Sequence, residues 1–233
     1  MDTKALQLAA RFALPPNSLG YCGKNTAPER LKNCVIHGEC GQIPDELSKF
    51  IVLNPYLETL AKALNTDKFS YLLIEAYCLG NDELKKIKQG DYHLLLEAFT
   101  KQGVPEWLVE ELKNDVPKNF IPFHLFQVLH VGVGRASGSV PFNLETINNC
   151  MVRWGEVIKV DSGQLTVDLN SLIRKKKYKL TTIQDKFDYR EDFLPGVKAG
   201  DIVAVHWKQA VKILTKEEVK NLDYWTREVL KTI

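Results

Sequence analysis

Residues 150–169, CMVRWGEVIKVDSGQLTVDL, decide the fold, because the spacing of apolar side chains changes there from helical to alternating. Apolar and polar residues alternate over 165–169, which is the two-residue period of a half-buried strand. The Asp-Ser-Gly sequence at 161–163 is typical of a turn. The stretch therefore predicts two strands joined by a turn.

Two more short strands are expected at residues 178–182 and 202–206. Short strands at this spacing are typical of a small β-barrel. Thr215 and Glu218 then form a capping box, which predicts a helix at the C-terminus. We expect residues 149–233 to form one barrel domain with that helix.

The residues before this point have helical spacing, punctuated by breakers. Pro15 and Pro16 are expected to end the first helix, because proline removes a backbone donor. Thr26 and Glu29 predict a capping box for a second helix that ends near Cys34. Residues 1–148 are thus predicted to form an α-helical domain, and the fold class is α+β. Further helices are expected near residues 54–64, 69–77, 92–100 and 105–113.

The composition fits one large or two small globular domains: 233 residues, 45% hydrophobic and 26% charged. A formal net charge of +2 supplies no global field that would attract nucleic acid or an anionic membrane. The first residues lack the pattern of a signal peptide, and no apolar run is long enough to span a bilayer, so we expect a cytoplasmic protein. Five cysteines, an odd number, favour free thiols or metal ligands over a disulfide framework.

The last 85 or so residues resemble the HypC/HupF-type chaperones of nickel-iron hydrogenase maturation. Residues 197–206, VKAGDIVAVH, are similar to the "VKxGDYVLVHxGxAI" segment of those chaperones. Cys150-Met151 begins the first strand, and residues 154–158, WGEVI, stand where the chaperones have a Pro-Gly-Lys-Val-Val-type turn. The resemblance implies an OB-like β-barrel with a C-terminal helix.

Nearly the full chain is similar to an uncharacterised family that joins such a module to a helical domain and is associated with hydrogenase genes. The N-terminal block of this resemblance is residues 10–23, ARFALPPNSLGYCG. Further matching blocks are Asn54–Leu57, Glu75–Tyr77 with Gly80-Asn81, Phe123–Phe126, Cys150 with Arg153–Gly155, and His206-Trp207.

The resemblance implies a mechanism in which a cysteine thiolate and a histidine hold an iron that carries cyanide and carbon monoxide. Cys150 and His206 match those two positions. A soft thiolate and an imidazole suit a low-spin iron, and so few protein ligands leave it transferable. The expected function is an accessory or chaperone role in hydrogenase maturation, with maturation proteins or the hydrogenase large subunit as partners.

Two further residues are candidates to complete this metal site across the domain interface, where ligand sites tend to occur. Cys22 lies in a Gly-rich loop after the double proline, and His124 lies in an apolar segment. The alternative for both is that they are ordinary core residues without a role in metal binding. We expect Asn17, Tyr21, Arg153, Trp154 and Trp207 to contact the ligand or to shield it from water.

Cys34, His37 and Cys40 form a separate Cys-x2-His-x2-Cys cluster, an alternative site for zinc or an iron-sulfur centre. Iron or zinc is therefore the expected metal. Buried or idle thiols are the competing interpretation of this cluster. The Gly-rich stretch at 132–138 lacks the Gly-Lys-Ser/Thr of a P-loop, so no nucleotide is expected.

The basic run at 174–179 is interpreted as a solvated hairpin loop, and nucleic acid is not an expected partner. No catalytic arrangement of Ser, His and Asp or of paired carboxylates is evident, so no catalytic residue is assigned. Two other functions stay open: a protein-protein interaction module without metal, and an enzyme that acts on a small ligand between the domains.

Overall fold

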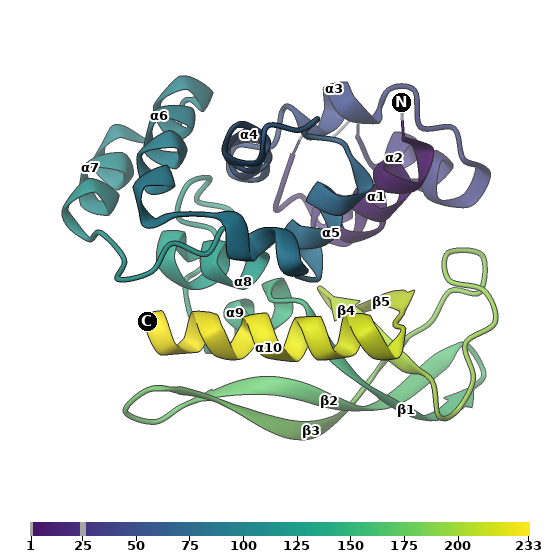
Figure 1. Ribbon diagram of the computed structural model, residues 1–233. Helices are drawn as coiled ribbons and strands as arrows, with labels where there is room; N and C mark the ends of the chain where they lie inside the picture. The colour runs from purple at the N-terminus through teal and green to yellow at the C-terminus, as the bar shows by residue number, and fades with distance from the viewer. Residues whose placement is uncertain (1, 24–26) are drawn as a thin grey trace.

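The first part of the chain is helical, as the apolar spacing predicts (Figure 1). The computed structural model describes residues 2–23 and 27–233. The capping box predicted at Thr26 lies outside the described residues. The helices are α1 (Thr3–Ser18), α2 (Ala27–His37), α3 (Ile43–Leu47), α4 (Leu53–Leu64), α5 (Tyr71–Cys78), α6 (Tyr92–Gln102), α7 (Glu106–Asn114), α8 (His124–Phe126) and α9 (Leu144–Cys150), with shorter turns η1 (Asp82–Lys86), η2 (Gln89–Asp91) and η3 (Gln127–Gly132).

The first helix does not end at the double proline, and this prediction was wrong: α1 continues through Pro15 and Pro16 to Ser18. Proline in a helix removes the bond from its own nitrogen to the carbonyl four residues earlier. The last turn closes without those bonds, because Leu19 N donates to Pro15 O at 3.3 Å and Tyr21 N to Pro16 O at 2.9 Å. The carbonyls of Arg11 and Phe12 thereby lack the N–H donor that a regular helix would supply four residues later.

The second part of the chain forms one antiparallel sheet in the order β3-β2-β1-β4-β5. Its strands are β1 (Arg153–Asp161), β2 (Gln164–Arg174), β3 (Tyr178–Asp188), β4 (Ile202–His206) and β5 (Gln209–Ile213). The four predicted strands are present, and the basic run forms the tip of the β2–β3 hairpin. Between β4 and β5, Trp207 (φ 49°) and Lys208 (φ 59°) make a two-residue turn.

The sheet is open, so the predicted closed barrel is not formed by the described strands. Closure would need the edge strands β3 and β5 to pair, yet each has one strand neighbour. The far part of β2 is instead held by α9: Asn148 Nδ2 donates to Leu172 O at 2.9 Å, and Leu172 N donates to Asn148 Oδ1 at 2.7 Å. The Asn148 side chain thus pairs with the part of β2 that extends beyond its pairing with β1.

The last helix, α10 (Lys216–Thr232), lies between the helices and the sheet (Figure 1). Its predicted capping box is present, because Glu218 N donates to Thr215 Oγ1 at 3.2 Å and Thr215 N donates to Glu218 Oε2 at 2.8 Å.

One cluster of buried apolar side chains runs through both parts of the chain. The predicted domain boundary at residues 148/149 falls inside α9, and the division into two domains stays a prediction. None of the described helices is long and apolar enough to cross a bilayer.

The packing of α10 against α5 depends on a glycine without a side chain. Gly80 has φ +80°, and a Cβ there would lie 2.3 Å from Trp225 Cδ1; Gly103 has a similar φ of +84° in open space. We predict that Gly103→Ala costs about 1 kcal/mol of unfolding free energy, and Gly80→Ala about 2–4 kcal/mol. Urea unfolding of the two variants measures the difference. Equal losses would contradict the packing described here.

Candidate metal centre

Three side chains gather where the helices meet the sheet: His124 at the start of α8, Cys150 at the end of α9 and His206 at the end of β4. One ligand atom from each lies within 4.8 Å of the others, and all three residues are buried. Cys150 Sγ is 4.0 Å from His124 Nε2. The edges of the two imidazoles and the thiol therefore face a common point.

His206 is held with a free lone pair directed into this site. Its Nδ1 is 2.7 Å from the carbonyl oxygen of Phe12. A carbonyl can only accept, so Nδ1 carries the proton. Burial, and secondarily His124, lowers the pKa of His206 to about 3, so the ring is neutral near pH 7. Nε2 is then an acceptor, and it is buried without a hydrogen-bond partner; the nearby backbone of Cys150 could bond only a protonated ring.

The double proline provides the acceptor that orients His206. In a regular helix the nitrogen of residue 16 would donate to the carbonyl of Phe12. Pro16 has no N–H, so the Phe12 carbonyl is available to His206 instead. A hydrogen bond on the far nitrogen fixes which ring nitrogen faces a ligand, and this is the usual second-shell arrangement of metal-binding histidines.

His124 has acceptors on both sides of its ring. Nε2 is 2.7 Å from the carbonyl oxygen of Cys150, and Nδ1 is 2.9 Å from the hydroxyl of Tyr77. Burial lowers the pKa of His124 to about 4, so this ring is also neutral. A carbonyl can only accept, so in this structure Nε2 carries the proton and donates to Cys150 O. The proton can move to Nδ1, because the Tyr77 oxygen can accept it while the Tyr77 O–H donates to the side-chain oxygen of Gln127. Binding a metal through Nε2 therefore requires this shift of the proton to Nδ1 and the loss of the hydrogen bond to Cys150 O.

Cys150 is a neutral thiol before any metal binds. Burial is the main cause that raises its pKa well above the ordinary value, and charge on Cys22 adds to it. Hydrogen bonding by the Trp207 side chain opposes the increase. The Trp207 Nε1 atom has no partner with regular hydrogen-bond geometry, so its N–H is available to a thiolate formed on metal binding.

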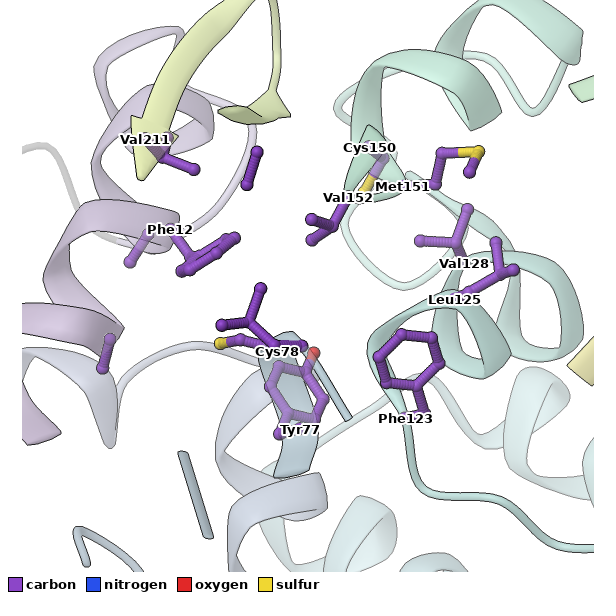
Figure 2. Packing of buried hydrophobic residues seen from close by; sticks show 14 of the residues in the cluster. Phe12, Tyr77, Cys78, Phe123, Leu125, Val128, Cys150, Met151, Val152 and Val211 are labelled. Atoms are coloured by element: carbon purple, nitrogen blue, oxygen red, sulfur yellow. The ribbon is translucent and has the colours of Figure 1, made fainter. Parts of the chain in front are cut away.

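The three donors line a cavity of about 360 Å³ that is mostly apolar. Figure 2 shows Phe12 of α1, Tyr77 and Cys78 of α5 and Cys150 at the end of α9 in this part of the core. Cys22 lines the same cavity, although it is not part of the three-residue group. The four residues proposed as ligands from the sequence are therefore brought to one cavity.

Of the five residues predicted to contact or shield the ligand, only some line this cavity. Tyr21 and Trp207 line the cavity, with ring centroids 4.7 Å apart. Asn17 reaches the site through the backbone, because its Nδ2 donates to Cys22 O at 2.6 Å. Arg153 and Trp154 are buried but are not among the described residues that line the cavity; Arg153 faces Ser171 and Asp185.

The alternative cluster at the N-terminus is not formed. Cys34 and Cys40 are joined by a disulfide, so their sulfur atoms are bonded to each other and do not act as metal ligands in this structure. His37 is exposed at the end of α2. The expectation of free thiols or metal ligands is therefore wrong for Cys34 and Cys40, whereas Cys22, Cys78 and Cys150 are free.

Sequence reasoning missed the residues that support the ligands. Phe12, Tyr77 and Gln127 lie far along the chain from the histidines they orient, and each resembles an ordinary core or helix residue in the sequence. The one available signal was Pro16, which marks a helical carbonyl without a partner. That signal was interpreted as the end of a helix.

One family model matches the whole chain. The model described as "Family of unknown function (DUF6390)" matches residues 1–233. The chain belongs to this family. No curated protein and no solved structure matches it. Membership of DUF6390 identifies no activity, so the function has to be argued from the site.

The two neutral histidines make stability depend on pH. An unfolded chain binds protons on both rings below a pKa of about 6.5, whereas burial lowers the pKa of His124 to about 4 and that of His206 to about 3 in the folded chain. Stability is therefore complete above pH 6.5 and decreases as the pH falls. We expect the two rings to cost about 2–4 kcal/mol of unfolding free energy between pH 7 and pH 5.

Urea unfolding at both pH values measures this loss in wild-type protein and in His206→Gln. The variant is expected to lose about half as much, because one of the two titrating rings is gone. His93→Gln, at an exposed histidine of α6, is the control. An unchanged pH dependence in His206→Gln would show that His206 is not buried in neutral form.

The role of Pro16 can be separated from general helix effects. Pro16→Ala restores an N–H that competes with His206 for the Phe12 carbonyl, whereas Pro15→Ala restores one that faces Arg11. We predict about 10-fold weaker metal binding for Pro16→Ala and unchanged binding for Pro15→Ala, measured by Co²⁺ titration. Equal affinities in the two variants would contradict the orienting role.

Proposed function

We propose that this member of DUF6390 binds a transition metal through Cys150, His124 and His206. The observation that carries the proposal is the buried Nε2 atom of His206, which has no hydrogen-bond partner. A ring nitrogen of His206 lies within 4.8 Å of the ligand atoms of His124 and Cys150. Burying such an acceptor without a partner is costly, and a bound metal would satisfy it. Both imidazoles also have an acceptor for the proton on the far nitrogen.

The donor set indicates the class of metal. One thiolate and two neutral imidazoles suit zinc, ferrous iron or cuprous copper, whereas magnesium and calcium prefer oxygen ligands. No Asp or Glu is among the described residues that line the cavity. The thiolate is then the negative charge that compensates the metal in an apolar environment.

The cavity supports a metal that carries small ligands of its own. A bare ion needs only the space between its donors, and about 360 Å³ is much more than that. Three protein donors leave coordination positions open on the cavity side. In the specific form of the proposal, the metal is an iron with cyanide and carbon monoxide ligands, and the chain is an accessory protein of hydrogenase maturation.

The resemblance of Cys150 and His206 to the HypC/HupF-type pair supports this specific form. In those chaperones the cysteine becomes the first residue and has a free amine, whereas Cys150 is internal. His124, which lies 4.0 Å from the thiol through Nε2, supplies a third donor in this chain instead. Maturation proteins or the hydrogenase large subunit are the proposed partners.

The test is metal analysis with infrared spectroscopy on protein purified without oxygen from a hydrogenase-producing host. Wild-type protein is expected to contain iron with cyanide or carbonyl bands. Cys150→Ala is expected to lose metal and bands, because the anionic donor is removed. Cys78→Ala removes another buried thiol of the same cavity and is expected to keep both.

Other outcomes are informative. Zinc or iron without cyanide or carbonyl bands, lost in Cys150→Ala, would support the metal site and contradict the iron-fragment role. Wild-type protein that neither contains metal nor binds added Zn²⁺, Fe²⁺ or Co²⁺ would contradict the metal site. The interaction module would then be the better interpretation of the fold.

A further inference from the structure

The metal cavity has a buried end and an open end. His124, Cys150 and His206 lie at the buried end, together with Tyr77. The lining residues Gly20, Gly23 and Ser137 are exposed, and Cys22, Ser139 and Val140 are partly exposed. Lys49, which also lines the cavity, is exposed as well. The mouth is thus formed by three segments: 19–23 after α1, 49–53 at the start of α4 and 134–140 before α9.

Cys22 is the thiol of this mouth. Of the three free cysteines, Cys78 and Cys150 are buried and Cys22 is partly exposed. The loop that carries it is tied down on both sides, because Asn17 Nδ2 donates to Cys22 O at 2.6 Å and Ser139 Oγ donates to Tyr21 O at 3.0 Å. Segments 19–23 and 134–140 are therefore linked to each other at the position of Cys22.

Cys22 is close to Cys150 without belonging to the inner group. Both line the same cavity, and a thiolate at Cys22 would raise the pKa of Cys150. Burial raises the pKa of Cys22 to about 11, so Cys22 is a neutral thiol before a metal binds. The ligand atoms that lie within 4.8 Å of one another come from His124, Cys150 and His206. A resident fourth ligand would be expected inside that group. A thiol at the mouth can instead bind a metal ion transiently, before the ion reaches the inner ligands.

We propose that Cys22 is the entry ligand, which captures the metal at the mouth and passes it to Cys150. The inference rests on the proposed metal site, whose unpartnered Nε2 of His206 marks where the metal comes to rest. It adds a transient, outer binding position for a soft or borderline metal ion. Capture at the mouth raises the concentration of the ion next to the inner donors.

The transfer is a ligand exchange without electron transfer. The Cys22 thiol gives its proton to solvent water as its sulfur-metal bond forms. The bond from the metal to Cys150 Sγ then forms, and the bond to Cys22 breaks. The proton of the Cys150 thiol passes to the sulfur of Cys22, so one proton is released in total and the charge of the metal ion is unchanged.

Stopped-flow mixing of the full chain with Co²⁺ follows the thiolate-to-metal charge-transfer band in real time. Wild-type protein is expected to show a fast phase at Cys22 and a slower change as the ion reaches the inner donors. Cys22→Ser is expected to lose the fast phase, to fill at least about 10-fold more slowly, and to reach the wild-type final spectrum and affinity.

Two variants make the assignment specific. Cys150→Ala is expected to retain the fast phase and to lack the final spectrum, because the ion stays at the mouth. Cys78→Ala, the buried thiol of the same cavity, is expected to behave as wild type.

Two results would overturn the proposal. If Cys22→Ser changes the final spectrum, Cys22 is a resident ligand. If Cys22→Ser fills as fast as wild type, the ion enters by another route. A wild-type chain with no thiolate band at all would contradict the metal site itself, which distinguishes that failure from the failure of the entry role.

Discussion

The hydrogen bond from His206 to the carbonyl of Phe12 connects the two parts of this molecule at its candidate site. It joins the last residue of β4 to the interior of α1, and it is available because Pro16 cannot donate to the same carbonyl. A buried carbonyl needs a partner, and a buried histidine needs its proton accepted. Each group satisfies the other, and the free side of the ring is left facing Cys150.

The same logic places the other two donors. Cys150 ends α9, and the neighbouring Asn148 is hydrogen-bonded to β2 at Leu172, so the thiol is positioned by both a helix and the sheet. His124 begins α8 and is held by Tyr77 of α5. The Trp207-Lys208 turn has positive φ at residues that rarely adopt it, and it places an indole N–H at the thiol. Positive φ at both residues is the ordinary geometry of a two-residue hairpin turn, and the unusual feature is that Trp and Lys occupy it instead of Asn and Gly.

Local signals predicted the local structure well. The alternation over 165–169, the strand at 202–206 and the Thr215–Glu218 box correspond to β2, β4 and the start of α10. Strand β5 was missed, because its turn consists of Trp and Lys where a sequence reader expects Gly or Asn. The open form of the sheet was missed because closure depends on whether edge strands meet, and no local pattern encodes that.

Cys22, His124, Cys150 and His206 were predicted to share a site from a resemblance and from their residue types, and the fold brings them to one cavity. Their supporting partners could not be predicted, because the Phe12 carbonyl and the Tyr77 hydroxyl become relevant only when distant segments pack together. The disulfide between Cys34 and Cys40 is a related case. Two cysteines six residues apart can either bind one metal ion together or form a disulfide, and the sequence does not distinguish the two. Residue types predicted the donors, whereas the tertiary packing determines what each donor can do.

Placing the three donors on separate segments has an energetic consequence. His124, Cys150 and His206 come together only when α8, α9 and β4 are docked, so a metal that binds them binds the folded arrangement and not the unfolded chain. The binding free energy then adds to the stability of the junction between helices and sheet. Without metal, the same junction contains a lone pair without a partner and a cavity, and both make it less stable than a filled apolar core. A ligand that binds in the cavity would offset this loss of folding stability. This is the arrangement expected of a ligand-binding site.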